Sequence, residues 1–116
     1  EWLSMIINMK LNNDPFNRIK NGSKTIELRL NDEKRSKLKV NDFIEFTNVE
    51  TNEKMLTEIM ELYKYDSFTK LYENFDKVSL GYSENDIADP NDMLEYYPKE
   101  LQDKYGVLGI KIKVKK

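Results

Sequence analysis

The sequence predicts an α+β domain in which short helices surround a small, mostly antiparallel sheet or barrel. Two observations support this prediction: the apolar stretches are short and separated by brief helices or turns, and few segments have the length of a long helix. A doubly wound parallel sheet is disfavoured, because its longer crossover helices alternate regularly with the strands. The 116 residues fit a single domain with one compact core. We expect the first and last strands to close the barrel.

The beginning of the chain predicts a strand followed by a short helix. Residues 5–11 hold enough apolar side chains for the strand, and Trp2 and Leu3 either extend it or pack as a terminal flap. The sequence leaves open whether residues 1–8 belong to the barrel or form a terminal extension of the single domain over residues 1–116. Asp14 and Pro15 indicate the helix start, because aspartate accepts hydrogen bonds from the first free amides and proline fits the first helical position.

Residues 22–30 predict a turn and then a half-buried strand. Gly22 supplies the left-handed residue that ends the preceding helix. Apolar and polar residues then alternate with a period of two, with Ile26, Leu28 and Leu30 set against Thr25, Glu27 and Arg29. Glu27 and Arg29 therefore share one face. Lys24 has the opposite parity, but a residue that leaves a turn can point across the strand end, so we hypothesise that it joins them.

The middle of the chain predicts a hairpin. Residues 31–39 are almost wholly polar, and a turn then leads into a strand over residues 43–46 that is rich in aromatic and branched side chains. The turn-forming stretch 48–53 precedes a fourth predicted strand over residues 55–63. The short spacing between the two strands favours antiparallel pairing.

An amphipathic helix is predicted next, capped by Asp66 or Ser67. Its apolar side chains follow the i, i+3, i+4 and i+7 spacing of a helix that packs on a sheet: Phe68, Leu71, Tyr72 and Phe75. We interpret this stripe as core packing.

The last third predicts two short helices and a final strand. Asp89 and Pro90 repeat the helix-start chemistry, and this helix ends at Pro98. Residues 99–104 form the second helix, which ends near Gly106. Residues 107–114 form the last strand, with its apolar residues inward and its lysines outward: Ile110, Ile112 and Val114 against Lys111 and Lys113.

The composition limits the possible chemistry and location. Cysteine and histidine are both absent, which removes disulfides, thiolate nucleophiles, the usual general base and the commonest metal ligand. Any catalysis must therefore use lysine, carboxylates or hydroxyl groups, and we expect no cofactor. No apolar run approaches the length needed to span a bilayer and no leader is visible, so we predict a cytoplasmic protein without membrane association.

The formal net charge of −2 allows nucleic-acid binding only through a local basic patch. Two such patches occur in the sequence: Lys34, Arg35, Lys37 and Lys39 in one, and Lys111, Lys113, Lys115 and Lys116 in the other. Both also fit an ordinary solvated surface.

The fixed positions of a G-x-K-x-x-E-x-R run are all present, as Gly22, Lys24, Glu27 and Arg29. With this run the chain resembles the ASCH domain family, a branch of the PUA-like small-barrel superfamily, and is similar to its bacterial subgroup. The resemblance begins near Met9 and covers nearly all of the remaining chain. Further positions carry it, among them Asp14-Pro15-Phe16, Gly81-Tyr82-Ser83, Ala88-Asp89-Pro90, Tyr96-Tyr97 and Tyr105-Gly106-Val107.

The resemblance implies a PUA-like barrel of five or six strands whose motif strand lines a cleft, and a role in RNA binding. On this hypothesis Arg29 supplies a planar donor fork, Lys24 a second cation, and Glu27 orients both or accepts from an exocyclic amine. Thr25 also belongs to this predicted site, where the partner is RNA or a modified nucleoside. Tyr82, Tyr96 or Tyr97 could stack on a base, although these tyrosines also suit the core. Glu27 and Arg29 equally fit an exposed ion pair.

An enzymatic alternative stays open at this point. Some relatives that the resemblance includes are amidohydrolases that deacetylate acetylcytidine, with a lysine at the position of Lys24 and a nucleophilic threonine at the position of Glu27. Thr25 lies two residues from Glu27, about 7 Å along a strand, and does not simply replace that threonine. Lys24 and Glu27 would then have acid and base roles.

The aspartates Asp86, Asp89 and Asp92 raise a metal alternative through their spacing of three. Pro90 interrupts any helix that would place them on one face, and capping explains two of the three. We therefore predict no metal.

Overall fold

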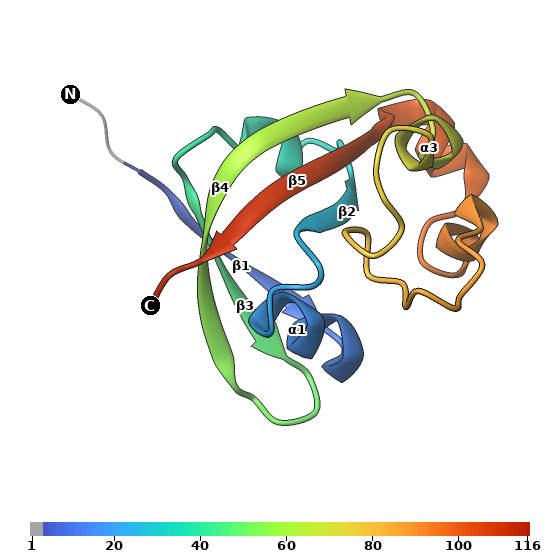
Figure 1. Ribbon diagram of the computed structural model, residues 1–116. Coiled ribbons are helices and arrows are strands. Elements are labelled where there is room, and N and C mark those ends of the chain that lie inside the picture. Colours follow the sequence, from blue (N-terminus) through green and yellow to red (C-terminus); the bar gives the residue numbers. More distant parts are fainter. Residues whose placement is uncertain (1–3) are drawn as a thin grey trace.

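The computed structural model describes residues 4–116, whose strands form a curled five-stranded sheet in the order β1-β3-β4-β5-β2 (Figure 1). The strands are β1 (Ile6–Leu11), β2 (Ile26–Leu30), β3 (Phe43–Asn48), β4 (Lys54–Tyr65) and β5 (Val107–Val114). All pairings are antiparallel except the parallel pairing of β1 with β3. The prediction of an α+β fold with five or six mostly antiparallel strands is confirmed.

The expectation that the first and last strands close the barrel is wrong. Strand β1 pairs with β3, whereas β5 lies between β4 and β2. The reason is the length of β4, whose 12 residues pair with β3 on one side and β5 on the other. A register shift between Ile59 and Glu61 accompanies its pairing with β5, as expected where a long strand bends. The sheet is therefore a half-barrel that stays open between β1 and β2.

Short helices cover the ends of this half-barrel: α1 (Asn13–Lys20), η1 (Arg35–Lys37), α2 (Phe68–Tyr72), η2 (Pro90–Glu95) and α3 (Lys99–Tyr105). The predicted helix end at Gly22 is confirmed, since this residue has φ +90° and its N–H donates to the carbonyl of Ile19 at 3.1 Å. Ser67 also caps α2 as predicted, with its hydroxyl accepting from the N–H of Lys70.

Two details of the helices differ from the prediction. Helix α1 starts after Asn12, two residues earlier than Asp14 and Pro15 suggest, because the backbone N–H of Asn13 donates to the Glu50 carboxylate in the β3–β4 turn. Asp14 instead pairs with Arg18, 2.8 Å away.

Helix α2 is also shorter than predicted, and it ends at Tyr72. The side-chain amide of Asn74 donates to the carbonyl of Lys70, which offers this segment a partner other than a continued helix. Phe75 consequently lies outside the helix, but its ring still packs edge-on against Tyr63 at 5.0 Å between centroids.

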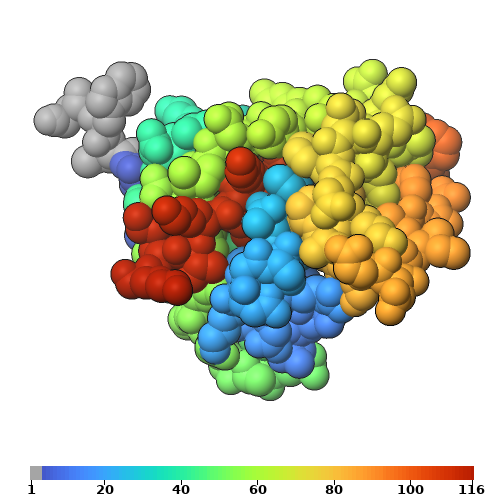
Figure 2. Space-filling view, in the orientation of Figure 1, coloured from blue at the N-terminus to red at the C-terminus, as the bar shows by residue number. Residues whose placement is uncertain are grey.

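The buried apolar side chains form two clusters. The larger cluster lies between α1 and strands β1, β3, β4 and β5, and includes Phe16, Phe46 and Ile59. The smaller cluster joins β2 and α2 to Leu80 and to tyrosines of the segment 80–97. The predicted inward side chains Ile110 and Ile112 are buried, while Val114 is half-buried. Figure 2 shows the blue N-terminal third lying beside the yellow and orange segment that follows α2.

Strand β1 includes residues 6–8, for which the sequence left open a place in the barrel or in a terminal extension. The predictions made for Trp2 and Leu3 lie outside the described residues. Within residues 4–116, no helix is both long and apolar enough to cross a bilayer.

Candidate functional site

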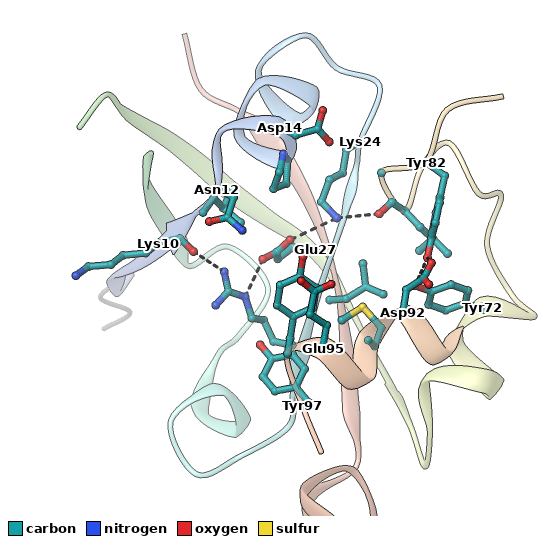
Figure 3. A pocket seen from close by; sticks show the side chains of 18 of the residues that line it. Lys10, Asn12, Asp14, Lys24, Glu27, Tyr72, Tyr82, Asp92, Glu95 and Tyr97 are labelled. Carbon is teal, nitrogen blue, oxygen red and sulfur yellow. Dashed lines mark hydrogen bonds and ion pairs between the residues drawn. The ribbon is translucent and has the colours of Figure 1, made fainter. Parts of the chain in front are cut away.

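A cavity of about 570 Å³ opens beside the gap between β1 and β2 (Figure 3). Its walls come from the end of β1 and the start of α1, from β2, and from the segment that runs between Leu80 and Tyr97. The cavity therefore lies where the half-barrel is open, and residues of both apolar clusters border it, Leu11 from the larger and Leu28 from the smaller.

Lys24 lies at the inner end of this cavity with only 5% of its surface exposed. Its Nζ donates to the carbonyl oxygens of Ile26 at 2.8 Å and Leu80 at 2.9 Å, and it lies 3.4 Å from Oε1 of Glu27. Three acceptors thus match the three hydrogens of an ammonium group. The hypothesis that Lys24 turns across the strand end to join Glu27 is confirmed.

Glu27 bridges the two cations of the motif. Its Oε2 accepts a hydrogen bond from Nε of Arg29 at 2.7 Å, and its own surface is 4% exposed. The Nη2 of Arg29 donates to the carbonyl of Lys10 at 3.0 Å, across the open edge of the sheet. The alternative of an exposed pair is wrong, because the segment 80–97 covers this face of β2.

Burial and the opposite charges nearby shift the pKa values of these three groups in opposite directions. Burial lowers the pKa of Lys24, although the Glu27 carboxylate opposes this shift. For Glu27, burial alone would raise the pKa, but Arg29 and Lys24 together outweigh it and hold the pKa below the usual value. Glu27 likewise raises the pKa of Arg29 despite the cost of burial. We therefore describe the site as two cations sharing one carboxylate.

All three tyrosines that the sequence analysis named, Tyr82, Tyr96 and Tyr97, line the cavity. The Tyr82 hydroxyl contacts the hydroxyl of Tyr72 at 2.9 Å and Oδ2 of Asp92 at 2.8 Å. The Tyr97 ring stacks on Phe68, with 6.0 Å between centroids and an interplanar angle of 21°. Burial raises the pKa of Tyr97, while the nearby Arg29 opposes the shift.

Thr25 is the one predicted site residue that the structure does not bring to the cavity wall. Its backbone N–H donates to the carbonyl of Ser79, and its carbonyl accepts from Ile112. These contacts fix the entrance of β2 against the loop before Leu80 and against β5. Thr25 supports the site through the backbone.

Several cavity groups were missed by the sequence analysis, above all the carbonyls of Lys10 and Leu80 and the side chain of Glu95. Backbone acceptors leave no signal in a sequence. Gly81 did leave one: it has φ +109°, and a Cβ there would lie 3.1 Å from Cδ of Lys24. The sequence shows that Gly81 lies in a turn-rich segment, but it does not show that the Lys24 side chain packs against this glycine.

The three aspartates of the metal alternative have other partners. Asp86 accepts from the N–H of Ser83, Asp89 from the N–H of Asn91, and Asp92 from the Tyr82 hydroxyl. Across residues 4–116, no cluster of three acidic side chains is arranged to hold a metal ion.

The two basic patches lie outside the cavity wall. Arg35 pairs with Asp32 at 2.7 Å, and Lys115 pairs with Glu58 at 3.1 Å. Both patches therefore include residues engaged in surface ion pairs.

Comparison with protein families matches residues 9–116 to the ASCH domain. The chain belongs to the ASCH domain family. Its curled half-barrel with peripheral helices is the PUA-like α+β fold that the resemblance implied. The comparison with curated proteins finds no match.

Several solved structures are similar in fold to this ASCH chain. The hypothetical protein PH0355 is 28% identical, with a TM-score of 0.81 over 96% of this chain and 100% of its own. Protein PF0455 from Pyrococcus furiosus is 29% identical, with a TM-score of 0.75 over 95% of this chain and 97% of its own. A ZmASCH variant from Zymomonas mobilis shares the fold at 12% identity, with a TM-score of 0.65 over 91% of this chain and 66% of its own.

Proposed function

We propose that this ASCH domain binds a nucleobase, presented by RNA or by a nucleotide, in the cavity beside the open edge of the half-barrel. The observation that carries the proposal is the convergence of Lys24, Glu27 and Arg29 on a cavity walled by Tyr82 and Tyr97. Membership of the ASCH family is consistent with RNA binding or a related function. The cavity volume of about 570 Å³ lies in the range of small-molecule sites.

Arg29 is the residue best placed to contact a ligand. Two of the five donors of a guanidinium are engaged by Glu27 and by the carbonyl of Lys10, so others remain for Tyr97 and for the acceptor edge of a base. Glu27 holds the planar fork in one orientation. Lys24, whose three hydrogens already have acceptors, acts mainly by holding Glu27 and the wall at Leu80.

The test is binding of short single-stranded RNA and of nucleotides by calorimetry, with Arg29→Lys and Arg29→Ala variants. Lys20→Ala serves as the surface control, because Lys20 does not line the cavity and pairs with Glu53. Loss of a charged hydrogen bond costs about 1.5–3 kcal/mol, so we expect about 10- to 100-fold weaker binding by both Arg29 variants. Equal affinity of wild type and Arg29→Ala would exclude the proposed site.

Salt dependence separates contacts to phosphates from contacts to the base. If Arg29 contacts a phosphate, Arg29→Ala lowers the slope of log affinity against log salt by about one unit. If it contacts a base edge, as we propose, the variant weakens binding and leaves the slope nearly unchanged.

A second candidate is hydrolysis of an acylated nucleoside such as acetylcytidine. The observation that favours it is a buried lysine with a lowered pKa beside a carboxylate in a cavity. Glu27 would activate water for attack on the amide carbonyl. Thr25 would not be the nucleophile, because it does not line the cavity.

This candidate is tested by acetate release from acetylcytidine. Turnover that is lost in both Glu27→Gln and Lys24→Ala, but kept in the surface variant Lys20→Ala, supports an enzyme. Circular dichroism must show that each variant is folded. Absence of release by the folded wild type excludes this reaction.

A further inference from the structure

We propose that the cavity selects a planar base that carries a positive charge, such as an N-methylated purine, over the neutral base of the same shape. The inference rests on the proposed function and names the chemical class of its ligand. It is carried by two features of the cavity mouth: carboxylates without a cationic partner, and a pair of adjacent tyrosines.

The charges that line the cavity divide into an inner cationic group and an outer acidic group. Inside, Lys24 and Arg29 share the single carboxylate of Glu27. Farther out, the charged groups are Lys10, Asp14, Asp92 and Glu95. Asp14 is neutralised by Arg18, and the Lys10 side chain extends away from Glu27 (Figure 3).

Asp92 and Glu95 therefore set the charge of the mouth. Within residues 4–116 neither carboxylate forms an ion pair, and the polar partner of Asp92 is the neutral hydroxyl of Tyr82. Both side chains come from η2, the short helix that forms one wall of the cavity. Asp92 and Glu95 are exposed, whereas Lys24 and Glu27 are buried, so the negative charge lies on the solvent side of the cavity.

Two adjacent tyrosines are the second feature of the cavity that favours a cationic base. Tyr96 lines the cavity with 56% of its surface exposed, and the next residue, Tyr97, also lines the wall and stacks on Phe68. Burial raises the pKa of Tyr96, and Glu95, Asp92 and Glu27 raise it further, so these carboxylates act on the same ring. Aromatic faces attract cations, and adjacent carboxylates strengthen that preference.

A phosphate is a poor fit for the same position. Two carbonyl oxygens and the Glu27 carboxylate already surround the Lys24 ammonium group, so Arg29 is the cation better placed to donate to a ligand in the inner cavity. Asp92 and Glu95 would repel a phosphate at the mouth. A cationic base can point its charged edge toward the two carboxylates of η2 and a hydrogen-bond acceptor toward Arg29. Such a base satisfies the carboxylates and the guanidinium at the same time.

The experiment compares matched nucleosides without phosphate by calorimetry: 7-methylguanosine against guanosine, and 1-methyladenosine against adenosine, at a pH where both methylated bases are cationic. We expect each cationic base to bind about tenfold or more tightly than its neutral partner. In the variant that combines Asp92→Asn with Glu95→Gln, the preference for the cationic base over its neutral partner should fall below about twofold. Glu100→Gln on α3 is the control, and it should keep the preference.

The outcomes separate this inference from the proposed function. Equal binding of charged and neutral bases, abolished by Arg29→Ala, overturns the inference and leaves the proposed function standing. A preference that survives removal of both carboxylates also overturns it. If no nucleoside and no RNA binds, both proposals fail.

Discussion

The Nζ of Lys24 lies 2.9 Å from the carbonyl oxygen of Leu80, a residue 56 positions later in the chain. This hydrogen bond joins the entrance of β2 to the segment that forms the opposite cavity wall. The lysine also holds Glu27, which in turn orients Arg29. One buried side chain thus couples the shape of the cavity to the orientation of its best ligand-binding group.

Replacing Lys24 should therefore destabilise the fold as well as the site. Lys24→Met leaves the Leu80 carbonyl without its donor and Glu27 with one cation, and we expect a loss of about 2–4 kcal/mol in the free energy of unfolding. Urea denaturation measures this loss. Lys20→Met is the control, because Lys20 pairs with Glu53 on the surface and such pairs contribute under about 1 kcal/mol. A similar small loss for both variants would contradict the coupling.

Gly81 gives an independent test of the same contact. Gly81→Ala places a Cβ 3.1 Å from Cδ of Lys24 in a backbone with φ +109°, whereas Gly22→Ala at φ +90° meets nothing within 4 Å. Both variants bear the left-handed backbone cost of about 1–2 kcal/mol. Thermal or urea unfolding should show Gly81→Ala to be the more destabilised of the two by about 1 kcal/mol or more. Equal losses would mean that the lysine moves aside freely.

The buried Glu27 makes a specific prediction for stability at acidic pH. Its folded pKa lies below the usual value of 4.5, so below that value the unfolded chain takes up a proton that the folded chain does not. The stability contributed by this group is therefore complete above pH 4.5 and is lost as the pH falls toward the folded pKa. Urea unfolding across this range should show a shallower decline for Glu27→Gln than for wild type. An unchanged decline would show that Glu27 does not carry the effect.

Much of this architecture could be predicted because its causes are local. The alternation of apolar and polar residues over 26–30 predicted β2, and Gly22 predicted the left-handed residue that follows α1. The closure of the barrel could not be predicted, because it depends on how far β4 extends and on which edges it pairs.

The candidate site, like the fold, could be predicted only in part from the sequence. The identities of Lys24, Glu27 and Arg29 were readable from the motif, but their burial was not, because the segment 80–97 that covers them packs by tertiary contacts. The acidic mouth was missed for a related reason. Asp92 was considered only in the metal alternative with Asp86 and Asp89, which was rejected, and only the packing of η2 against α2 brings it to the cavity.

Tyr97 provides the last test, which concerns stacking of a ligand. Alanine substitution of a stacking aromatic residue costs about 1–3 kcal/mol per base, so Tyr97→Leu should weaken RNA or nucleoside binding about 5- to 150-fold. Tyr97→Phe keeps the ring and its contact with Phe68, so it should bind within about threefold of wild type if the ring face carries the interaction. Calorimetry on both variants, with unfolding curves to show that each is folded, checks the prediction. If Tyr97→Phe binds as weakly as Tyr97→Leu, the hydroxyl beside Arg29 carries the interaction, and Tyr97 binds its ligand by hydrogen bonding.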